Sequence, residues 1–330
     1  MRIVKTSMFF LALLLPGLAL AAPAASTHAT AAAKTSMNTA SLADLEAPKA
    51  NKTYTVGTLR VQQYGNHGRP LILIPGLEGG SWVWRDTIGN FRSDHVIYAV
   101  TLAGFDGIPA PKGGGSLFDR GDASLLKLIK SRHIEKPVLI GHSLGGTLSI
   151  RFAEQHSKLL SGVIAVDGLP ILPGMERVSA KQRKVYAAQA EARIAKATPE
   201  QFHQGVIAFM VRRDMLDAAR AKRYAALNAR SDQAASAKYF GEDMAADYRP
   251  GLKNIGVPLL EISPYNAPDF SKPPLVMTGE QKTKYYESLL AGAPHAKVVS
   301  ISPARHFVMF DQPKQFQAAL TTFLVGLAKK

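Results

Sequence analysis

Short, continuously apolar segments alternate with longer segments of helical periodicity along most of this chain of 330 residues. An apolar run without polar alternation is typical of a strand that is covered on both faces. Such runs lie at 70–76, 95–107, 137–143 and 160–170. The segments 117–133 and 144–156 carry apolar residues at helical spacing. This alternation predicts an α/β fold with a mostly parallel sheet and helices on both faces.

The pattern changes after the fourth apolar run. The segment from 171 to about 250 is rich in Ala, Arg, Lys and Gln and is helical in character throughout. Within it, Thr198-Pro199-Glu200-Gln201 combines a capping threonine, a proline at the first helical position and a glutamine three residues on. Apolar strand-like runs resume at 257–263 and 296–302, and the chain ends in a helical pattern. We therefore expect a helical insertion between two strands of the sheet.

The first 22 residues form a unit of their own. They have a short basic start, an apolar run at 8–20 and the small-residue sequence Ala19-Leu20-Ala21. This is the composition of a secretory signal peptide, with cleavage predicted after Ala21 or Ala22. The apolar run is too short to cross a bilayer, so no membrane span is expected in the mature chain. The sequence therefore predicts a periplasmic or secreted protein.

Residues 23–52 are rich in Ala, Ser and Thr and lack apolar periodicity. This composition predicts a flexible leader, because too little apolar surface is available to offset the entropy of ordering. The folded domain is expected to span 53–330.

The chain is basic, with 40 Lys and Arg against 25 Asp and Glu and a formal net charge of +15. Removal of the signal peptide brings this to about +13. The basic residues are dispersed among acidic ones and form no nucleic-acid motif, so no nucleic-acid partner is expected. The absence of cysteine excludes disulfides and cysteine chemistry. No metal-binding motif or phosphate-binding glycine loop occurs, so neither a metal nor a cofactor is expected.

A serine between glycines follows the apolar run at 137–143. The sequence Gly141-His142-Ser143-Leu144-Gly145 has the pattern G-x-S-x-G, set between a predicted strand and a predicted helix. A nucleophile that stands clear of a sheet needs a sharp turn, and glycines leave the room for it. The start of the helix then offers backbone N–H groups to a developing negative charge. His142 is expected to line the pocket or support the site, because side chains of adjacent residues point apart on such a turn.

At three places the chain resembles the α/β-hydrolase superfamily, and the resemblance spans nearly all of 53–330. The sequence "GHSLGG" is similar to the nucleophile turn of that family. "LILIPGLEGGSWVW" is similar to its oxyanion loop, where the family often has His-Gly and this chain has Pro75-Gly76. "SPARHFVMFDQPKQF" resembles its C-terminal histidine segment. The resemblance implies an α/β-hydrolase fold in which the helical insertion, about 171–250, is a cap over the site.

Carried over to this sequence, the resemblance implies Ser143 as nucleophile and His306 as general base. The backbone N–H groups of Leu77 and Leu144 would form the oxyanion hole. Independently of the resemblance, a serine hydroxyl needs an adjacent base to act as a nucleophile near neutral pH, and the pKa of histidine suits that duty. His295 precedes its strand and is the poorer candidate.

The acid that would orient His306 is where the sequence departs from the family pattern. The family usually places it after the strand that follows the cap, and the nearest acid there is Asp269, in a Pro-rich loop. Asp167, at the end of the run 160–170, is the alternative acid, because some family members use that strand. Asn266 is a third, uncharged candidate. Our first expectation is Asp269.

Both tryptophans of the chain, Trp82 and Trp84, follow the predicted oxyanion loop. We expect them to form an apolar wall of the substrate pocket, with core packing as the alternative. The sequence therefore predicts a serine hydrolase that cleaves a small-molecule carboxylic ester through an acyl-enzyme on Ser143. An acyltransferase or a C–C or amide hydrolase could use the same residues. A non-catalytic ligand-binding homologue is the alternative from another class, and the oligomeric state is not indicated.

Overall fold

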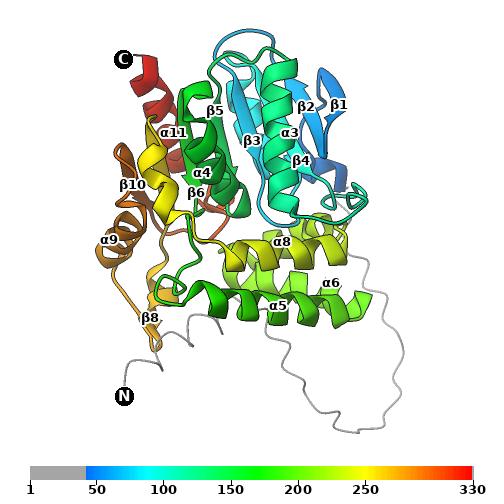
Figure 1. Ribbon diagram of the computed structural model, residues 1–330, viewed down its shortest axis with the longest axis vertical. Helices are drawn as coiled ribbons and strands as arrows, with labels where there is room; N and C mark the ends of the chain where they lie inside the picture. Colours follow the sequence, from blue (N-terminus) through cyan, green and yellow to red (C-terminus); the bar gives the residue numbers. More distant parts are fainter. Residues whose placement is uncertain (1–41, 329–330) are drawn as a thin grey trace, which may run out of the picture.

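An eight-stranded, mostly parallel sheet forms the centre of the molecule (Figure 1). The computed structural model describes residues 42–328, so the predicted signal peptide and most of the predicted leader lie outside the described residues. The strand order is β1-β2-β4-β3-β5-β6-β7-β10, and only β2 runs antiparallel to its neighbours. The strands are β1 (Lys52–Val56), β2 (Leu59–Tyr64), β3 (Leu71–Ile74), β4 (Ile97–Leu102), β5 (Val138–His142), β6 (Gly162–Val166), β7 (Leu259–Pro264) and β10 (Ala296–Ile301).

The central strands are continuously apolar because each one contributes to two cores. In β3, Leu71 and Leu73 join the core on one face of the sheet, while Ile72 and Ile74 join the core on the other face. Side chains alternate between faces along a strand, so a strand covered on both sides needs apolar residues at every position. All four residues of β3 are fully buried.

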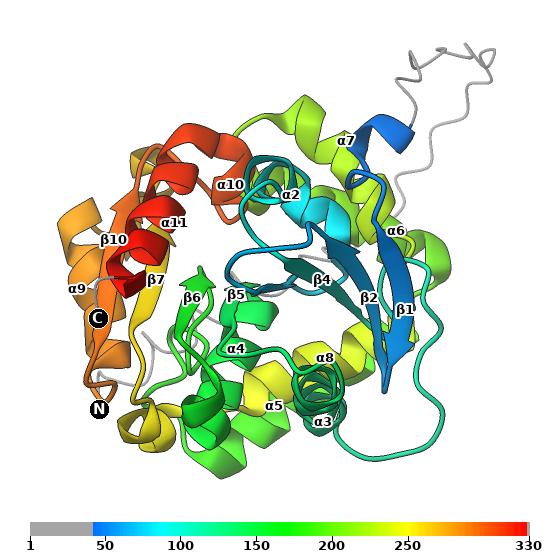
Figure 2. The ribbon, with the colours of Figure 1, turned by 90° about the horizontal axis from the view of Figure 1, so that it is seen from above.

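Helices cover both faces of the sheet, as predicted (Figure 2). One face packs against α3 (Leu117–Ser131), α4 (Leu144–His156) and α9 (Gly279–Leu290). The opposite face packs against α2 (Arg85–Phe91), α10 (Val308–Asp311) and α11 (Pro313–Ala328). The short helices α2 and α9 were not expected from the sequence. Among residues 42–328, no helix is long and apolar enough to cross a membrane.

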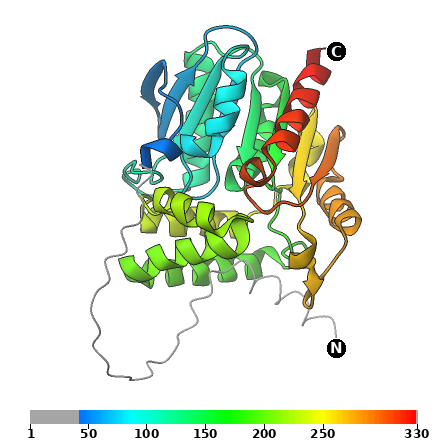
Figure 3. The same ribbon diagram turned by 180° about the vertical axis from the view of Figure 1, so that it is seen from behind.

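The helical insertion lies between β6 and β7 and covers the carboxyl ends of the parallel strands (Figures 1 and 3). Its helices are α5 (Ala180–Lys196), α6 (Pro199–Phe209), the π-helical turn η4 (Met210–Asp214), α7 (Ala218–Asn228) and α8 (Gln233–Ala245). The predicted start of α6 is confirmed, because the side chains of Thr198 and Gln201 cap each other's backbone N–H groups. We call the segment from α5 to α8 the cap.

Several short elements connect these layers. A two-stranded hairpin follows β7, and single 3-10 turns occur along the chain. These elements are η1 (Leu42–Leu45), η2 (Ser81–Trp84), η3 (Ser157–Leu159), η5 (Arg249–Asn254), η6 (Ala267–Phe270), β8 (Ser271–Lys272) and β9 (Leu275–Val276).

The last part of the predicted leader packs against the domain. Leu45 of η1 is buried. Glu46 forms an ion pair with Arg230, at 2.5 Å, where the chain leaves α7. Arg85 of α2 donates to the carbonyl of Asp44. The structure thus shortens the predicted leader at its carboxyl end, because apolar burial and an ion pair hold residues 42–51 in place.

Candidate active site

Ser143 occupies a strained turn between β5 and α4. Its backbone has φ 52° and ψ −125°, a conformation that non-glycine residues rarely adopt. A Cβ at Gly141 would lie 2.1 Å from the carbonyl oxygen of Gly145, and a Cβ at Gly145 would lie 2.2 Å from that of Ile74. The turn can therefore form only with glycine at both positions, which is the steric reason for the G-x-S-x-G pattern.

The loop after β3 passes directly beside Ser143. A Cβ at Gly76 would lie 2.9 Å from the Cβ of Ser143, so the chain here approaches as closely as glycine allows. Leu77 follows in that loop, and Leu144 is the first residue of α4, where a backbone N–H has no partner within the helix. Both leucines line the same cavity as Ser143. The structure thus brings the two predicted oxyanion donors to the serine.

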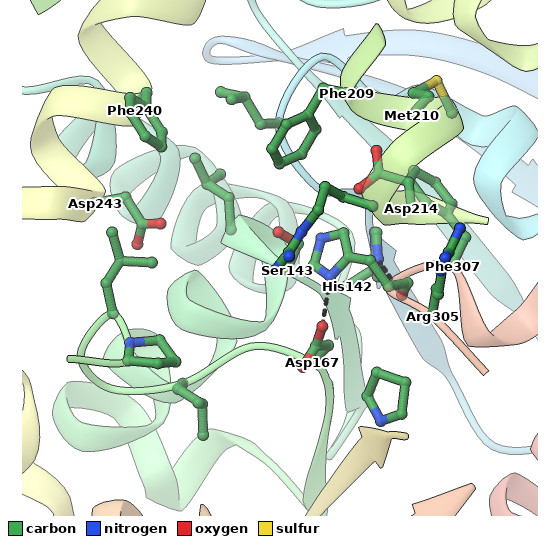
Figure 4. A pocket seen from close by; sticks show the side chains of 18 of the residues that line it. His142, Ser143, Asp167, Phe209, Met210, Asp214, Phe240, Asp243, Arg305 and Phe307 are labelled. Atoms are coloured by element: carbon green, nitrogen blue, oxygen red, sulfur yellow. Dashed lines mark hydrogen bonds and ion pairs between the residues drawn. The ribbon is translucent and has the colours of Figure 1, made fainter. Parts of the chain in front are cut away.

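His306 lies in the loop between β10 and α10, on the cavity that Ser143 lines. Its Nδ1 is 2.6 Å from Oδ2 of Asp167, the residue that follows β6. Asp167 has a left-handed backbone, with φ 49°, and its N–H donates to the carbonyl of Ile262 on β7. This turn aims the carboxylate away from the sheet and toward the imidazole. Figure 4 shows Asp167 below Ser143.

Asp269, the acid expected first from the sequence, does not reach His306. Both of its carboxylate oxygens accept hydrogen bonds from the guanidinium of Arg305, each at 2.8 Å. Asn266 donates to the same carboxylate and is equally occupied. A planar guanidinium binds a carboxylate through two parallel hydrogen bonds. Arg305 therefore holds Asp269 away from His306. The structure corrects the expectation in favour of the alternative, Asp167.

Helix α9 supplies the remaining contacts of Asp167. The hydroxyl of Tyr286 donates to Oδ1 at 2.6 Å, and the ammonium of Lys282 lies 3.9 Å from the same oxygen. Burial by itself raises the pKa of the Asp167 carboxyl, but Lys282 and the hydrogen bonds from His306 and Tyr286 hold it below its ordinary value. Asp167 is therefore ionised. The sequence reasoning missed both residues, although the start of α9 carries a capping signal in Thr278 and Gln281.

The two histidines of the site carry opposite pKa shifts. Burial lowers the pKa of His306, but the hydrogen bond and charge of Asp167, with a contribution from Asp214, raise it above its ordinary value. Burial and the nearby His306 hold the pKa of His142 well below its ordinary value. His142 donates from Nε2 to the carbonyl of His306, and the two rings lie 4.5 Å apart. His142 is thus a buried support of the histidine loop, in line with the supporting place expected for it.

The two tryptophans do not form a wall of the pocket. Trp82 and Trp84 are fully buried and do not line the cavity. The turn η2 directs Trp82 toward α10, where its ring stacks on those of Phe307 and Phe310. The prediction of a substrate wall is therefore wrong, and core packing holds at both positions. Among these residues Phe307 does reach the cavity.

A cavity of about 330 Å³ lies between the sheet and the cap, and Ser143, His306 and Asp167 all line it. Most of the cap residues that line it are apolar or aromatic. Phe202, Val206 and Phe209 come from α6, Met210 from η4 and Phe240 from α8. Figure 4 shows Phe209, Met210 and Phe240 around the space above Ser143. Such a mostly apolar cavity with a few polar groups is typical of a small-molecule site.

Residues 214–216, between η4 and α7 in the middle of the cap, are tied to the histidine loop by three hydrogen bonds, and a fourth bond lies within that loop. Phe307 N–H donates to the carbonyl of Asp214 at 2.8 Å, and Arg305 donates to that of Met215 at 3.1 Å. The carboxylate of Asp311 accepts from the N–H groups of both Leu216 and Arg305. These hydrogen bonds join residues 214–216 to the loop that carries His306.

No group of three or more histidine and acidic side chains within residues 42–328 is arranged to hold a metal ion. The chemistry that the described residues can perform is that of a serine hydroxyl, a histidine and a carboxylate. These three groups come from the ends of β5, β10 and β6, at one edge of the sheet.

Comparison with known proteins agrees with this architecture. Residues 71–319 match the family model of the alpha/beta hydrolase family, and the chain belongs to that family. A putative carbamate hydrolase RutD of Serratia proteamaculans is 29% identical over 118 residues, which is 34% of this chain and 43% of that protein. The human (lyso)-N-acylphosphatidylethanolamine lipase is 28% identical over 131 residues, 38% of this chain and 37% of the relative. The similarity thus spans less than half the length of these curated relatives.

Solved structures share the fold over most of the chain. A hydrolase from Pseudomonas aeruginosa superimposes with a TM-score of 0.67 at 17% identity, covering 83% of this chain and 99% of the other. A putative aryl esterase from Burkholderia cenocepacia gives a TM-score of 0.65 at 23% identity, with coverages of 84% and 100%. At these identities the likeness establishes the fold and leaves specificity to the residues of the site.

Proposed function

We propose that the protein is a serine hydrolase that cleaves carboxylic esters through an acyl-enzyme on Ser143. The observation that carries the proposal is the pairing of His306 with Asp167 at 2.6 Å, beside a serine on a strained turn and within one cavity. A positioned serine, base and carboxylate are the minimal parts of nucleophilic acyl transfer.

The first half of the reaction follows from this geometry. Ser143 Oγ attacks the ester carbonyl and passes its proton to Nε2 of His306. The carbonyl oxygen becomes an oxyanion, which accepts hydrogen bonds from the Leu77 and Leu144 N–H groups. The imidazolium is stabilised by Asp167, which also fixes the tautomer by accepting from Nδ1. His306 then returns the proton to the leaving alcohol, and the acyl group remains on Ser143.

The second half uses water in place of the serine. His306 takes a proton from a water molecule as the oxygen attacks the acyl-enzyme, and the proton returns to Ser143 as the carboxylic acid leaves. The same two N–H groups stabilise the second oxyanion. A cavity of about 330 Å³ with mostly apolar walls suits an ester of small or medium size.

Labelling and turnover test this proposal directly. A fluorophosphonate probe should label the wild type on Ser143, and p-nitrophenyl butyrate should be hydrolysed with a burst of p-nitrophenol. Ser143→Ala should lose the label and at least about 10³-fold in kcat. The function fails if the folded wild type shows neither labelling nor turnover, or if Ser143→Ala hydrolyses the ester as fast as the wild type.

A further inference from the structure

The cavity carries an acidic surplus in a basic protein. Five acidic side chains line it against three basic ones, whereas the whole chain has 25 acidic against 40 basic residues. Two of the five are already paired, Asp167 with His306 and Asp269 with Arg305. The lining acids are Glu78, Asp167, Asp214, Asp243 and Asp269, and the lining bases are Arg213, Lys282 and Arg305.

Three of the lining carboxyl groups form no ion pair among the described residues and have no role in the proposed mechanism. Glu78 comes from the oxyanion loop, Asp214 ends the π-helical turn η4, and Asp243 lies on α8. Each is more than nine-tenths buried, with 8%, 4% and 9% of its surface exposed. Figure 4 shows Asp243 and Asp214 on opposite sides of the cavity. A buried carboxyl with too few hydrogen-bond partners costs folding stability, so its place in the cavity wall favours a ligand that carries a donor.

A second observation points the same way. Oδ1 of Asp214 and Oδ1 of Asn228 are both buried and have no hydrogen-bond partner within the described chain. Asn228 is 5% exposed, ends α7 and also lines the cavity. Both atoms are acceptors, so what they lack is a donor. A purely apolar ester would leave them unpaired when it displaces water, at a cost that a donor on the ligand would remove.

We propose that the cavity selects esters that carry an ammonium group, which is bound by the carboxylates of Asp214 and Glu78 together with the amide oxygen of Asn228. This inference rests on the proposed hydrolase function. An ammonium has three donors for the unpaired acceptors. The faces of Phe209 and Phe240, which stand around the same space, add attraction for a cation. Arg213 is the one basic lining residue that is not paired with Asp167 or Asp269, and the carboxyls of Asp214 and Glu78 outnumber it.

The charge state of the carboxyls makes the selection depend on pH. Burial raises the pKa of Asp214 to about 6, of Asp243 to about 7 and of Glu78 to about 8. His306, Arg213 and Arg305 face Asp214 and lower its pKa, while Asp167 raises it. Asp214 raises that of Glu78, and the hydroxyls of Ser236 and Thr147 lower those of Glu78 and Asp243. Preference for a cation should therefore grow as pH rises through this range.

Two matched ester series test the proposal on the full mature chain. In the acyl series, p-nitrophenyl ω-aminohexanoate is compared with its isosteres, the ω-hydroxyhexanoate and the heptanoate. In the alcohol series, ω-aminohexyl butyrate is compared with ω-hydroxyhexyl and heptyl butyrate. We expect kcat/KM of the amine to exceed that of the apolar isostere about tenfold or more in one series. The ratio should rise from about pH 6 to about pH 8.

Variants tie the preference to the carboxyls. Asp214→Asn and Glu78→Gln should each lower the amine-to-apolar ratio toward one, and the exposed matched control Glu287→Gln should keep the wild-type ratio. The proposal is overturned if the apolar ester is as good as the amine in both series, or if the hydroxyl ester equals the amine at all pH values. Because fluorophosphonate labelling and turnover of the apolar esters are measured alongside, either result would leave the hydrolase function standing. If the wild type showed neither labelling nor turnover of the apolar esters, the hydrolase function itself would be contradicted.

Discussion

At the scale of single residues, two adjacent residues of one loop bind different aspartates. Arg305 and His306 are neighbours in sequence, and each takes one aspartate. Arginine binds Asp269 through two hydrogen bonds, which leaves Asp167 to the histidine. The pairing decides which carboxylate can stabilise the imidazolium.

We therefore expect Asp167→Asn and Asp269→Asn to differ sharply. Asp167→Asn should lower kcat for p-nitrophenyl butyrate about 10³- to 10⁴-fold, because the imidazole loses its charged partner and the favoured tautomer. Asp269→Asn should cost less than about tenfold in kcat and on the order of 1 kcal/mol of stability, because its ion pair with Arg305 is partly exposed. Steady-state kinetics with thermal unfolding checks both. Equal losses of kcat in two folded variants would contradict the assignment of Asp167.

At the scale of elements, the strands and the cap could be predicted from the sequence, and the placement of loops could not. A strand such as β5 is buried at every position. Burial of this kind shows in the sequence as a short, continuous run of apolar residues. The partner of Asp167 depends on where Arg305 points and on α9, whose polar composition gave no clear periodicity. The tryptophans were placed wrongly because the direction of the turn η2 is set by contacts with α10, more than 200 residues away.

Helix α9 should affect the pH dependence through Asp167. Tyr286→Phe removes a hydrogen bond at 2.6 Å, so Asp167 becomes a stronger acceptor for His306 and is held less firmly. We expect kcat to fall about tenfold and the acidic limb of the kcat/KM profile to move to higher pH. The sign follows because His306 is active when neutral, and a stronger carboxylate partner raises its pKa.

Tyr285→Phe is the matched control for this prediction. The hydroxyl of Tyr285 contacts Glu176 and the N–H of Gly174 and does not contact Asp167. The control should keep the wild-type acidic limb. If Tyr286→Phe kept both the wild-type kcat and the wild-type acidic limb of the kcat/KM profile, α9 would only pack against the sheet.

At the scale of the whole molecule, the cap is anchored unevenly. Residues 214–216, between η4 and α7, are hydrogen-bonded to the histidine loop. In α6, by contrast, only Val206 is buried, and most of the helix is exposed or partly exposed. Opening of the cavity should therefore begin at α6 and leave residues 214–216 in place.

Hydrogen exchange followed by mass spectrometry should resolve this difference. Peptides from α6 should exchange faster than those that cover residues 214–216, and a fluorophosphonate adduct on Ser143 should slow exchange in α6. If α6 and residues 214–216 exchange at one common rate, with and without the adduct, the cap opens as a single body. The hydrogen bonds to the histidine loop would then not hold residues 214–216 in place.

Ser143 and Asp167 both have left-handed backbones at the ends of two paired strands. Each such conformation costs on the order of 1–3 kcal/mol, which the rest of the fold must offset. Glycine at either position would relieve this strain and remove a reacting group at the same time. Selection for thermostability alone would therefore favour inactive chains, and an engineering screen of this protein has to select for turnover and stability together.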